Sequence, residues 1–386
     1  MYLHHNLLLT PGPTPVPKEI ENAINSPLLG HRSKDFETLA DQAFKAMKPI
    51  FGTENDVLIL TSSGTSALEA SMLNIVNPDD HFVIIVSGAF GNRYKQIAET
   101  YYEHVHVYDV EWGQAVDVNA FKSYLESLDV EITAVFTQFC ETSTTVLHPV
   151  KALGQAIKDF NDSIYFVVDG VSCIGAVDIN MADSQIDVLV SGSQKAIMLP
   201  PGIAFVAYND RAKARFNDVT TPRFYLNLDK YIKSQDKSST PFTPSVSLFQ
   251  AVIKYAEIVE REGFSKTIAR HNTIKDAVRK ALTALDLPLL VEDAYASPTV
   301  TAFIPKDKDE LNFIKNELKS RFNITIAGGQ GKLKGEILRV GHMGKVNPFD
   351  ILTFVGALEI LLTEFRNTSY LGKGTQSYLE VIQNDL

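Results

Sequence analysis

The sequence predicts an α/β fold: a mostly parallel, seven-stranded sheet covered by helices on both faces, followed by a smaller α+β domain. Short and almost unbroken apolar runs alternate with longer helix-like stretches through the first part of the chain. Parallel sheets whose two faces are both covered produce such runs. The chain has 386 residues, which is long for one core and favours two domains. We predict an N-terminal arm over 1–19, a large domain over 20–262 and a small C-terminal domain over 263–386.

The elements follow from these patterns in chain order. Prolines and leucines in MYLHHNLLLTPGPTP favour an extended arm. Helical patterns are expected at 37–51, 65–76, 92–102, 150–160 and 248–262. Strands are expected at 57–60, 81–86, 104–110, 134–139, 164–169, 187–192 and 202–208. Beyond 263, helices mix with strands such as SPTVTAFIP and GEILRVG, and a short polar tail, SYLGKGTQSYLEVIQNDL, closes the sequence.

Composition narrows the class of protein. A formal net charge of -10 argues against a nucleic-acid or anionic-membrane partner. Cys140 and Cys173 lie in apolar contexts without metal-ligand spacing, so we expect reduced core cysteines, no metal site and a cytoplasmic location. The N-terminus lacks a basic region before an apolar segment, and no apolar run reaches the roughly 18–20 residues of a membrane helix. Neither a signal peptide nor a membrane span is expected.

The end of the first expected strand carries a candidate anion site. Open parallel sheets bind ligands outside the carboxyl ends of their strands. After VLIL come small polar residues, and a helix is expected to begin at about Thr65 or Ser66, with Glu69 in capping-box spacing. Free N–H groups and the helix dipole at such a point attract phosphate. Taken alone, the stretch fits an ordinary capped helix at least as well.

Two further strand ends carry a carboxylate and an amine. Asp169 closes IYFVVD, where a turn-forming role is the simpler interpretation. Lys195 follows DVLVSG, where it either reaches solvent or loses its charge, for instance in a Schiff base with an aldehyde. Together, a phosphate cradle, a carboxylate for a pyridinium nitrogen and a lysine for an aldehyde are the parts of a pyridoxal 5′-phosphate site.

The sequence resembles a known family, the class V (fold type I) pyridoxal-phosphate aminotransferases. Within it, the resemblance is strongest to the serine/alanine–glyoxylate (pyruvate) group. The resemblance runs from about Leu9 to about Leu362. SGSQKAIMLPPG resembles the segment around the family's Schiff-base lysine, VVDGVSCIG its strand end and TSSGTSALEA its phosphate loop. The motifs TPGPTPVP, GHRSKDF, VSGAFGNR, ETSTTVLHP and LRVGHMG also match in kind and in order.

The resemblance implies roles for individual residues. Lys195 would form the Schiff base and move the proton, and Asp169 would pair with the pyridine nitrogen. The other expected cofactor contacts are Ser63, Gly64 and Thr65 with Gln194 at the phosphate, Phe90 and Val171 on the two ring faces, and Thr142 near the 3′-oxygen. Many relatives have tryptophan at the position of Phe90, and the family has glycine where Thr145 stands here.

The substrate and subunit contacts are implied in the same way. Arg339 would bind the substrate α-carboxylate, and Gly12 would lie close to the substrate. Thr240 and Thr243 resemble a segment that one subunit donates to its partner's cofactor phosphate, which makes a homodimer with shared sites the expected assembly. His31 and Arg32 lie near the expected entrance. Arg32 either favours an acidic substrate or pairs with Asp35 or Glu37, and both interpretations stay open.

The leading hypothesis is transamination. Serine, alanine or aspartate would donate the amino group, and glyoxylate or pyruvate would accept it. Within the same fold the alternatives are a carbon–sulfur lyase of the desulfurase type, or a transaminase acting on a phosphonate or phosphoserine substrate. A non-catalytic binding subunit is the alternative from a different class, and the presence of Lys195, Asp169 and Arg339 argues against it.

Overall fold

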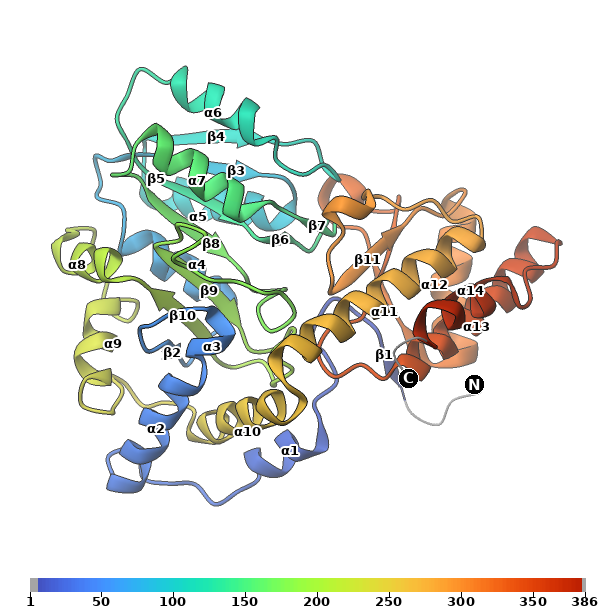
Figure 1. The fold of residues 1–386 in the computed structure, drawn as a ribbon, viewed down its shortest axis with the longest axis horizontal. Coiled ribbons are helices and arrows are strands. Elements are labelled where there is room, and N and C mark those ends of the chain that lie inside the picture. Colours follow the sequence, from blue (N-terminus) through green and yellow to red (C-terminus); the bar gives the residue numbers. More distant parts are fainter. Residues whose placement is uncertain (1–5, 384–386) are drawn as a thin grey trace.

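A seven-stranded sheet forms the centre of the larger part of the molecule, at the left of Figure 1. The computed structural model describes residues 6–383. Across the sheet the strands run in the order β2 (Leu58–Leu60), β10 (Ala204–Tyr208), β9 (Val188–Gly192), β8 (Tyr165–Asp169), β5 (Ile132–Gln138), β3 (His81–Val86) and β4 (Val105–Asp109). Neighbouring strands are parallel except at β10, which is antiparallel to both β2 and β9. The predicted α/β fold with a mostly parallel sheet is confirmed.

Alternate residues of the strands face two separate cores, because side chains along a strand point in opposite directions. The core that contains Phe136 and Val167 is closed by α4 (Gly64–Leu73), α5 (Ala89–Tyr101), α8 (Asp210–Asp218) and α9 (Leu228–Gln235). The core that contains Val135 and Val168 is closed by α2 (Lys34–Ala46), α3 (Lys48–Phe51), α6 (Val118–Glu126), α7 (Val150–Phe160) and α10 (Val246–Glu262). Strands enclosed on both sides explain the unbroken apolar runs in the sequence.

The helix expected over 37–51 is in fact two helices, and that prediction was wrong in detail. α2 ends at Ala46, and α3 begins at Lys48 with Pro49 in its first turn. Proline has no N–H to donate to the preceding helical turn, so an uninterrupted helix is disfavoured at this point. Gly52 then ends α3 in the left-handed region, at φ 57°.

A second, smaller body lies at the right of Figure 1 and has its own apolar core. Its antiparallel sheet has the order β11 (Val300–Phe303), β14 (Leu338–Gly341) and β13 (Ala327–Gly328). It is covered by α11 (Phe264–Ala284), α12 (Lys308–Phe322), α13 (Pro348–Arg366) and α14 (Lys373–Ile382). The helix α14 replaces much of the expected polar tail, because Tyr378 and Ile382 are buried in this core.

The N-terminal segment joins this smaller body before it reaches the large sheet. β1 (Leu7–Leu8) pairs in parallel with β12 (Ile324–Thr325), and Leu9 is buried in the same core. The remaining elements are α1 (Lys18–Ile24), the paired strands β6 (Cys140–Glu141) and β7 (Val146–Leu147), and two short 3₁₀ turns, η1 (Asp293–Tyr295) and η2 (Gly331–Leu333). The arm limits and the division at residue 262 stay predictions.

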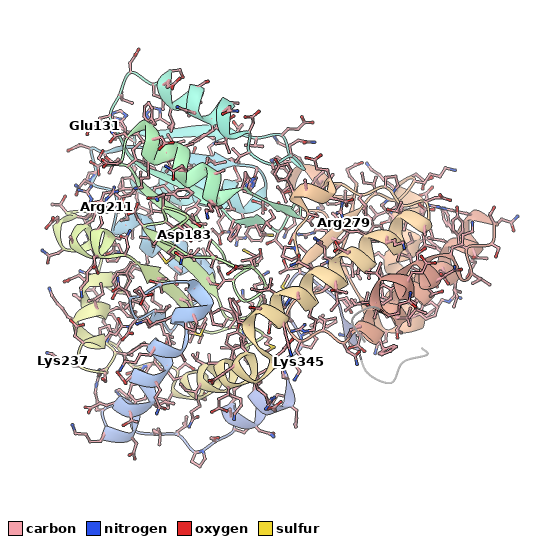
Figure 2. The ribbon with its side chains drawn as sticks, viewed as in Figure 1. Glu131, Asp183, Arg211, Lys237, Arg279 and Lys345 are labelled. Carbon is pink, nitrogen blue, oxygen red and sulfur yellow. The ribbon has the colours of Figure 1, made fainter. Side chains whose placement is uncertain are left out.

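Charged residues make up 21% of the chain. In Figure 2 the labelled side chains of Glu131 and Lys237 point outward, and both residues are exposed. Within residues 6–383, no helix combines the length and the apolar character that crossing a membrane requires.

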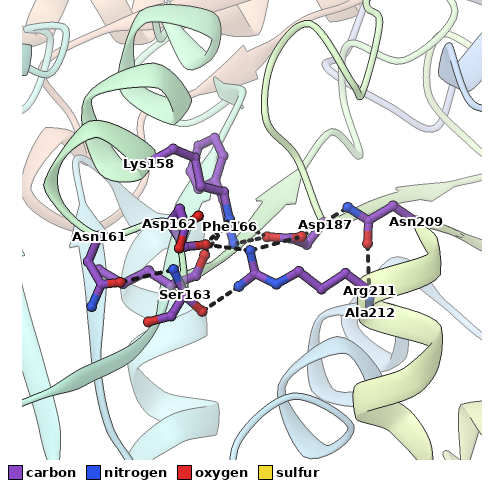
Figure 3. A network of polar contacts seen from close by, with 10 residues as sticks. Lys158, Asn161, Asp162, Ser163, Phe166, Asp187, Asn209, Arg211 and Ala212 are labelled. Atoms are coloured by element: carbon purple, nitrogen blue, oxygen red, sulfur yellow. Dashed lines mark hydrogen bonds and ion pairs between the residues drawn. The ribbon is translucent and has the colours of Figure 1, made fainter.

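A buried ion pair closes the amino end of β8 and β9 (Figure 3). The carboxylate of Asp187 is 2% exposed and lies 3.0 Å from the Lys158 ammonium. It also accepts hydrogen bonds from the backbone N–H of Phe166 at 2.8 Å and from the Asn209 amide at 2.9 Å. Arg211 approaches the same carboxylate at 3.8 Å. One carboxylate therefore connects β8, β9, α7 and α8.

Replacing Asp187 by alanine is expected to lower the free energy of unfolding by about 3–5 kcal/mol, because Lys158 would keep a largely buried charge without its partner. Chemical denaturation of the variant measures this. Asp162 lies beside the network but is exposed, so Asp162→Ala is the control and should change stability by less than about 0.5 kcal/mol. Equal stabilities for the two variants would show that the ion pair contributes nothing.

Candidate active site

The candidate site lies at the carboxyl edge of the parallel strands, where β8 ends at Asp169 and β9 ends three residues before Lys195. Because β8 and β9 are neighbours in the sheet, the carboxylate and the amine come to the same edge. The charge of Asp169 is close enough to affect the pKa of Lys195. The sequence prediction that these strand ends share one site agrees with this placement.

Lys195 is held against the N-terminal segment. Its Nζ donates a hydrogen bond to the carbonyl of Pro11, and its own carbonyl accepts one from Thr14 Oγ1 at 3.2 Å. Burial, together with the positive charge of Arg339, lowers the pKa of Lys195 to about 8. A substantial part of the amine is therefore neutral near physiological pH, as a nucleophile or general base requires.

Gly12 is the contact that allows this packing. A methyl group on Gly12 would lie 2.5 Å from Lys195 Cδ and 2.8 Å from Nζ, and its φ is +96°. Only glycine combines this conformation with so close an approach. The residue expected near the substrate thus lies directly beside the amine.

Asp169 is buried at 4% exposure, and its Oδ1 accepts a hydrogen bond from the backbone N–H of Val171 at 2.8 Å. Burial raises the pKa of Asp169 to about 7, and the nearby carboxylate of Glu141 acts in the same direction. A cation beside this carboxyl would stabilise its ionised form and would be bound more tightly as a result.

Four of the expected cofactor contacts lie around the end of β9 and the start of α4. A methyl group on Gly192 would lie 3.1 Å from Gln194 Oε1, 3.5 Å from Val171 Cγ1 and 3.6 Å from Gly64 Cα. Ser63 is the N-cap residue of α4, and its side chain makes no capping hydrogen bond. Three of these residues are far apart in the sequence, yet the fold brings them together.

The start of α4 differs from the expected capping box. The helix begins at Gly64, and Ser66 Oγ donates to the carbonyl of Ser63 at 2.8 Å. Glu69 does not cap the helix, because it accepts a hydrogen bond from the Tyr101 hydroxyl. With no acidic residue in the first turn, the N-terminus of α4 keeps its preference for an anion.

Phe90 is presented by the N-terminus of α5, which a buried carboxylate fixes in place. Glu141 Oε2 accepts hydrogen bonds from the backbone N–H groups of Phe90 at 3.0 Å and Gly91 at 2.9 Å. Glu141 Oε1 accepts one from Ser143 Oγ at 2.6 Å, and that hydroxyl oxygen accepts one from Ala89 N at 2.8 Å. The Phe90 ring is half-buried. Sequence reasoning missed Glu141 and Ser143, since their helix partners are some fifty residues away.

Arg339 is a buried residue of the central strand of the smaller sheet. It is 4% exposed, and it lies in β14 between β11 and β13. Its Nε and one terminal nitrogen donate to the carbonyl of Gly328 at 3.0 and 2.8 Å, and the other terminal nitrogen donates to the carbonyl of Thr142 at 2.8 Å. Burial lowers the pKa of Arg339 to about 10, so it remains cationic at neutral pH. Within residues 6–383 these bonds use three of the five N–H groups of the guanidinium, which leaves two for a ligand.

Thr145 takes the backbone conformation that a glycine would take. Its φ is 64°, inside the turn between β6 and β7, and its N–H donates to the carbonyl of Glu141 at 2.7 Å. A β-branched residue is rarely found in this region. Thr145 therefore holds a conformation that glycine adopts more readily.

The strain at Thr145 predicts an inverted order of stability for two variants. Alanine is normally more stable than glycine by about 0.5–1 kcal/mol, but a left-handed conformation costs an L-residue roughly 1–2 kcal/mol. Thr145→Gly should therefore unfold at a higher urea concentration than Thr145→Ala. Both variants lose the hydroxyl and γ-methyl of Thr145 and differ only at Cβ, so a more stable alanine variant would show that the turn is not strained.

The segment with Thr240 and Thr243 lies next to the start of α4 in the same chain. Ser245 N donates to Thr61 Oγ1 at 2.9 Å, just before Ser63. Thr240 is buried and its hydroxyl donates to the carbonyl of Phe242 at 2.8 Å, whereas Thr243 is exposed. Thr240 Oγ1 is thus already bonded within its own segment.

Arg32 contacts this segment rather than a neighbouring acid. Its guanidinium donates to Ser239 Oγ at 3.0 Å and to the carbonyl of Thr240 at 2.8 Å. Glu37 lies 3.1 Å from Lys34 instead. His31 is half-buried. These contacts connect two motifs that were separate in the sequence.

The residues at this edge fit pyridoxal phosphate. Lys195 supplies a partly neutral amine, Asp169 a buried carboxyl that a cation would favour, and α4 an uncapped helix start. Gly64 and Gly192 lack side chains where the cradle narrows. The donor set therefore matches an aldehyde, a pyridine nitrogen and a phosphate in one ligand.

The chain is similar to known proteins over most of its length. The model of the family described as aminotransferase class-V matches residues 16–335. The soluble hydrogenase small subunit of a Synechococcus species is 38% identical over 365 residues, covering 94% of each chain. The serine–glyoxylate aminotransferase of Hyphomicrobium methylovorum is 30% identical and covers 97% of this chain and 93% of its own.

A solved structure extends the similarity to the fold. The pyridoxamine-pyruvate aminotransferase of Mesorhizobium loti has a TM-score of 0.93 with this chain at 26% identity, and the match covers 100% of both chains. The chain therefore belongs to the class-V aminotransferase family and is a pyridoxal-phosphate enzyme that transfers an amino group between an amino acid and an oxo acid.

Proposed function

We propose that this enzyme transfers the amino group of a small α-amino acid, namely serine, alanine or aspartate, to glyoxylate or pyruvate. The observation that carries the proposal is the position of Arg339, a buried cation with two free N–H groups whose charge lowers the pKa of Lys195. A carboxylate bound there would lie close to the amine. The names of the relatives support serine as donor and glyoxylate or pyruvate as acceptor.

The chain's own residues then divide the work. When bound, pyridoxal phosphate supplies an aldehyde and an electron sink. Arg339 holds the substrate α-carboxylate through two hydrogen bonds, which a planar guanidinium does well. Lys195 Nζ would take the proton from the substrate Cα and pass it to C4′, the cofactor carbon that receives the amino group, within the same half-reaction.

The remaining residues bind and orient the cofactor and the substrate. Asp169, in its charged form, pairs with the pyridine nitrogen, and the N-terminus of α4 with Ser63, Thr65 and Gln194 binds the phosphate. Phe90 and Val171 enclose the ring, Thr142 approaches the 3′-oxygen, and Gly12 leaves room for the substrate beside Lys195. Each assignment places a residue type where its chemistry is needed.

Steady-state kinetics with a panel of donors tests the function. Serine, alanine and aspartate are each paired with glyoxylate and with pyruvate, and initial rates are measured at several concentrations of both substrates. A covalent cycle in two halves gives parallel double-reciprocal lines for the preferred pair. Absence of turnover with all three donors, or intersecting lines, would reject the proposal.

The state of the cysteines disfavours the desulfurase alternative and supports a cytoplasmic location. Cys140 and Cys173 are both free and buried, and burial raises the pKa of each thiol. A thiol that accepts sulfur must be exposed and reactive. Two free thiols without a disulfide are also typical of a reducing compartment.

A homodimer with shared sites completes the proposal. Phe224 is 71% exposed and lies with Phe242 and Tyr225 in one aromatic cluster, in which the Tyr225 and Phe242 rings are 4.8 Å apart. The exposed Thr243 follows directly. A second copy of the chain would cover this cluster and receive Thr243, with Thr240 held by Arg32, at its phosphate.

Phe224→Lys is expected to shift the protein toward monomers, because a charge would enter an apolar contact beside Lys230, whose ammonium lies 4.1 Å from the ring. Sedimentation velocity reports the assembly, and equilibrium dialysis the cofactor affinity, which should fall with it. Phe349, 52% exposed in the smaller body, gives the control variant Phe349→Lys. A Phe224→Lys protein that remains dimeric and binds the cofactor normally would refute this interface.

A further inference from the structure

Gln138 has a fully buried amide that finds no partner within residues 6–383. It is the last residue of β5 and is 0% exposed, and both its Nε2 and its Oε1 lack a hydrogen bond. A buried polar group without a partner costs roughly 1–3 kcal/mol. Such groups are rare in folded proteins and call for an explanation, which is often a functional one.

The register of the sheet places this amide beside Asp169. Gln138 and Asp169 are paired residues of the parallel strands β5 and β8, so their side chains lie on the same face. Phe136, two residues earlier on that face, contacts the Tyr94 ring of α5, with 5.4 Å between the ring centroids. Burial, and then the charge of Asp169, raises the pKa of Tyr94. The side chains of Gln138 and Asp169 therefore lie in the layer between the sheet and α5.

The backbone of α5 closes this layer above the amide. A methyl group on Gly91 would lie 2.7 Å from Gln138 Oε1. The Gly91 N–H is already donated to Glu141 Oε2 at 2.9 Å, so it is not directed to the glutamine. Rotation about the last side-chain bond exchanges the amide oxygen and nitrogen. The carboxylate of Asp169 stands at the paired position of the neighbouring strand and can accept from the amide nitrogen.

We propose that Gln138 is a positioning residue for Asp169: its Nε2 donates a hydrogen bond to the Asp169 carboxylate when pyridoxal phosphate is bound, and so holds that carboxylate in its charged form toward the pyridine nitrogen. This inference rests on the role proposed above for Asp169. The residue would act through the carboxylate and would not touch the substrate.

Physical chemistry gives the donor a clear effect. A hydrogen bond to a carboxylate favours its ionised form, whereas burial disfavours it. The backbone N–H of Val171 is one donor to Asp169, and burial with the nearby Glu141 still raises the pKa of Asp169 to about 7. A second donor would offset part of that penalty in the loaded enzyme.

The test separates the empty protein from the loaded one. Gln138→Met keeps the length of the side chain and removes both unpaired polar atoms. The variant without cofactor should be as thermally stable as the parent or more so. Its affinity for pyridoxal phosphate, measured by equilibrium dialysis, should fall roughly 10- to 150-fold, the value of one hydrogen bond to a charged group.

Gln235 provides the matched control. It is also buried, but its Nε2 donates to the carbonyl of Val57 at 3.1 Å and its Oε1 accepts from the Tyr208 hydroxyl at 3.4 Å. Gln235→Met should therefore destabilise the cofactor-free protein and leave the cofactor affinity unchanged. The opposite behaviour of the two variants would establish that the Gln138 amide acts only in the loaded state.

Asp169→Asn distinguishes failure of this inference from failure of the proposed role of Asp169. If Asp169→Asn weakens cofactor binding while Gln138→Met leaves it within about twofold of the parent, the inference about Gln138 is wrong and the role of Asp169 stands. If neither variant changes the affinity, the role of Asp169 is wrong as well. A loss of stability of the cofactor-free Gln138→Met protein as large as that of Gln235→Met would also overturn the inference.

Discussion

Lys195→Ala is expected to lower turnover by at least roughly 10⁴-fold. Loss of a general acid–base group alone costs about 10²–10⁴-fold, and the nucleophile disappears at the same time. Burial and the charge of Arg339 lower the pKa of Lys195 to about 8, and alanine leaves no amine in that environment. Borohydride reduction followed by peptide mass analysis should find the cofactor on Lys195 in the parent and on no peptide of the variant.

Two controls make this result specific. Lys195→Arg keeps the charge near Pro11 but cannot bond covalently to an aldehyde, so it should lose turnover as well. Lys237 is exposed and points outward in Figure 2, and Lys237→Ala should behave like the parent. A Lys195→Ala protein that still carries the cofactor covalently on another residue would remove Lys195 from the proposed role.

Arg339→Ala is expected to weaken the binding of every α-amino acid and every 2-oxo acid by about 10- to 150-fold. The loss corresponds to about 1.5–3 kcal/mol for a hydrogen bond to a charged group. Because the contact is with the carboxylate that all these substrates share, the loss should be similar for serine, alanine and aspartate. Apparent affinities from half-reaction titrations measure it.

Arg339→Lys is the informative companion. A lysine keeps the charge but has no planar fork, so it cannot hold Gly328 and Thr142 while binding a carboxylate through two hydrogen bonds. We expect it to recover only a small part of the affinity. Unchanged affinity in Arg339→Ala, or a loss confined to one donor, would place the α-carboxylate elsewhere.

The sheet and its edge were predictable because short-range patterns determine them. Enclosure of β5, β8 and β9 on both faces requires unbroken apolar runs, and these runs end where the polar residues begin. Asp169 and Lys195 could be assigned to one site because parallel strands bring their carboxyl ends to the same edge. The number of strands follows from the pattern, but the antiparallel direction of β10 does not.

The contacts that hold the site together could not be predicted from the sequence. Glu141 caps α5 from the β6–β7 hairpin, 51 residues along the chain from Phe90. Arg32 donates a hydrogen bond to the carbonyl of Thr240, 208 residues away in the sequence. Such pairs leave no periodic signal in the sequence. The break between α2 and α3 does have a mark in the sequence, which is Pro49. The helical pattern on both sides of this proline nevertheless led to the prediction of one helix.

The orphan amide of Gln138 shows a further limit. In the sequence it is one polar residue at the end of an apolar strand, indistinguishable from a residue that reaches solvent. Only the register with Asp169 and the closeness of Gly91 show that it is enclosed without a partner. Its meaning depends on three elements that meet only in the folded chain.

The most direct test of the central claim is a single half-reaction on the purified enzyme loaded with pyridoxal phosphate. Serine, alanine and aspartate are added one at a time without an acceptor, while the absorbance of the cofactor is followed and the released oxo acid is quantified. The account predicts that at least one donor converts the cofactor to its amine form with one equivalent of oxo acid per site. A cofactor spectrum that remains unchanged with all three donors, with no oxo acid released, would contradict it.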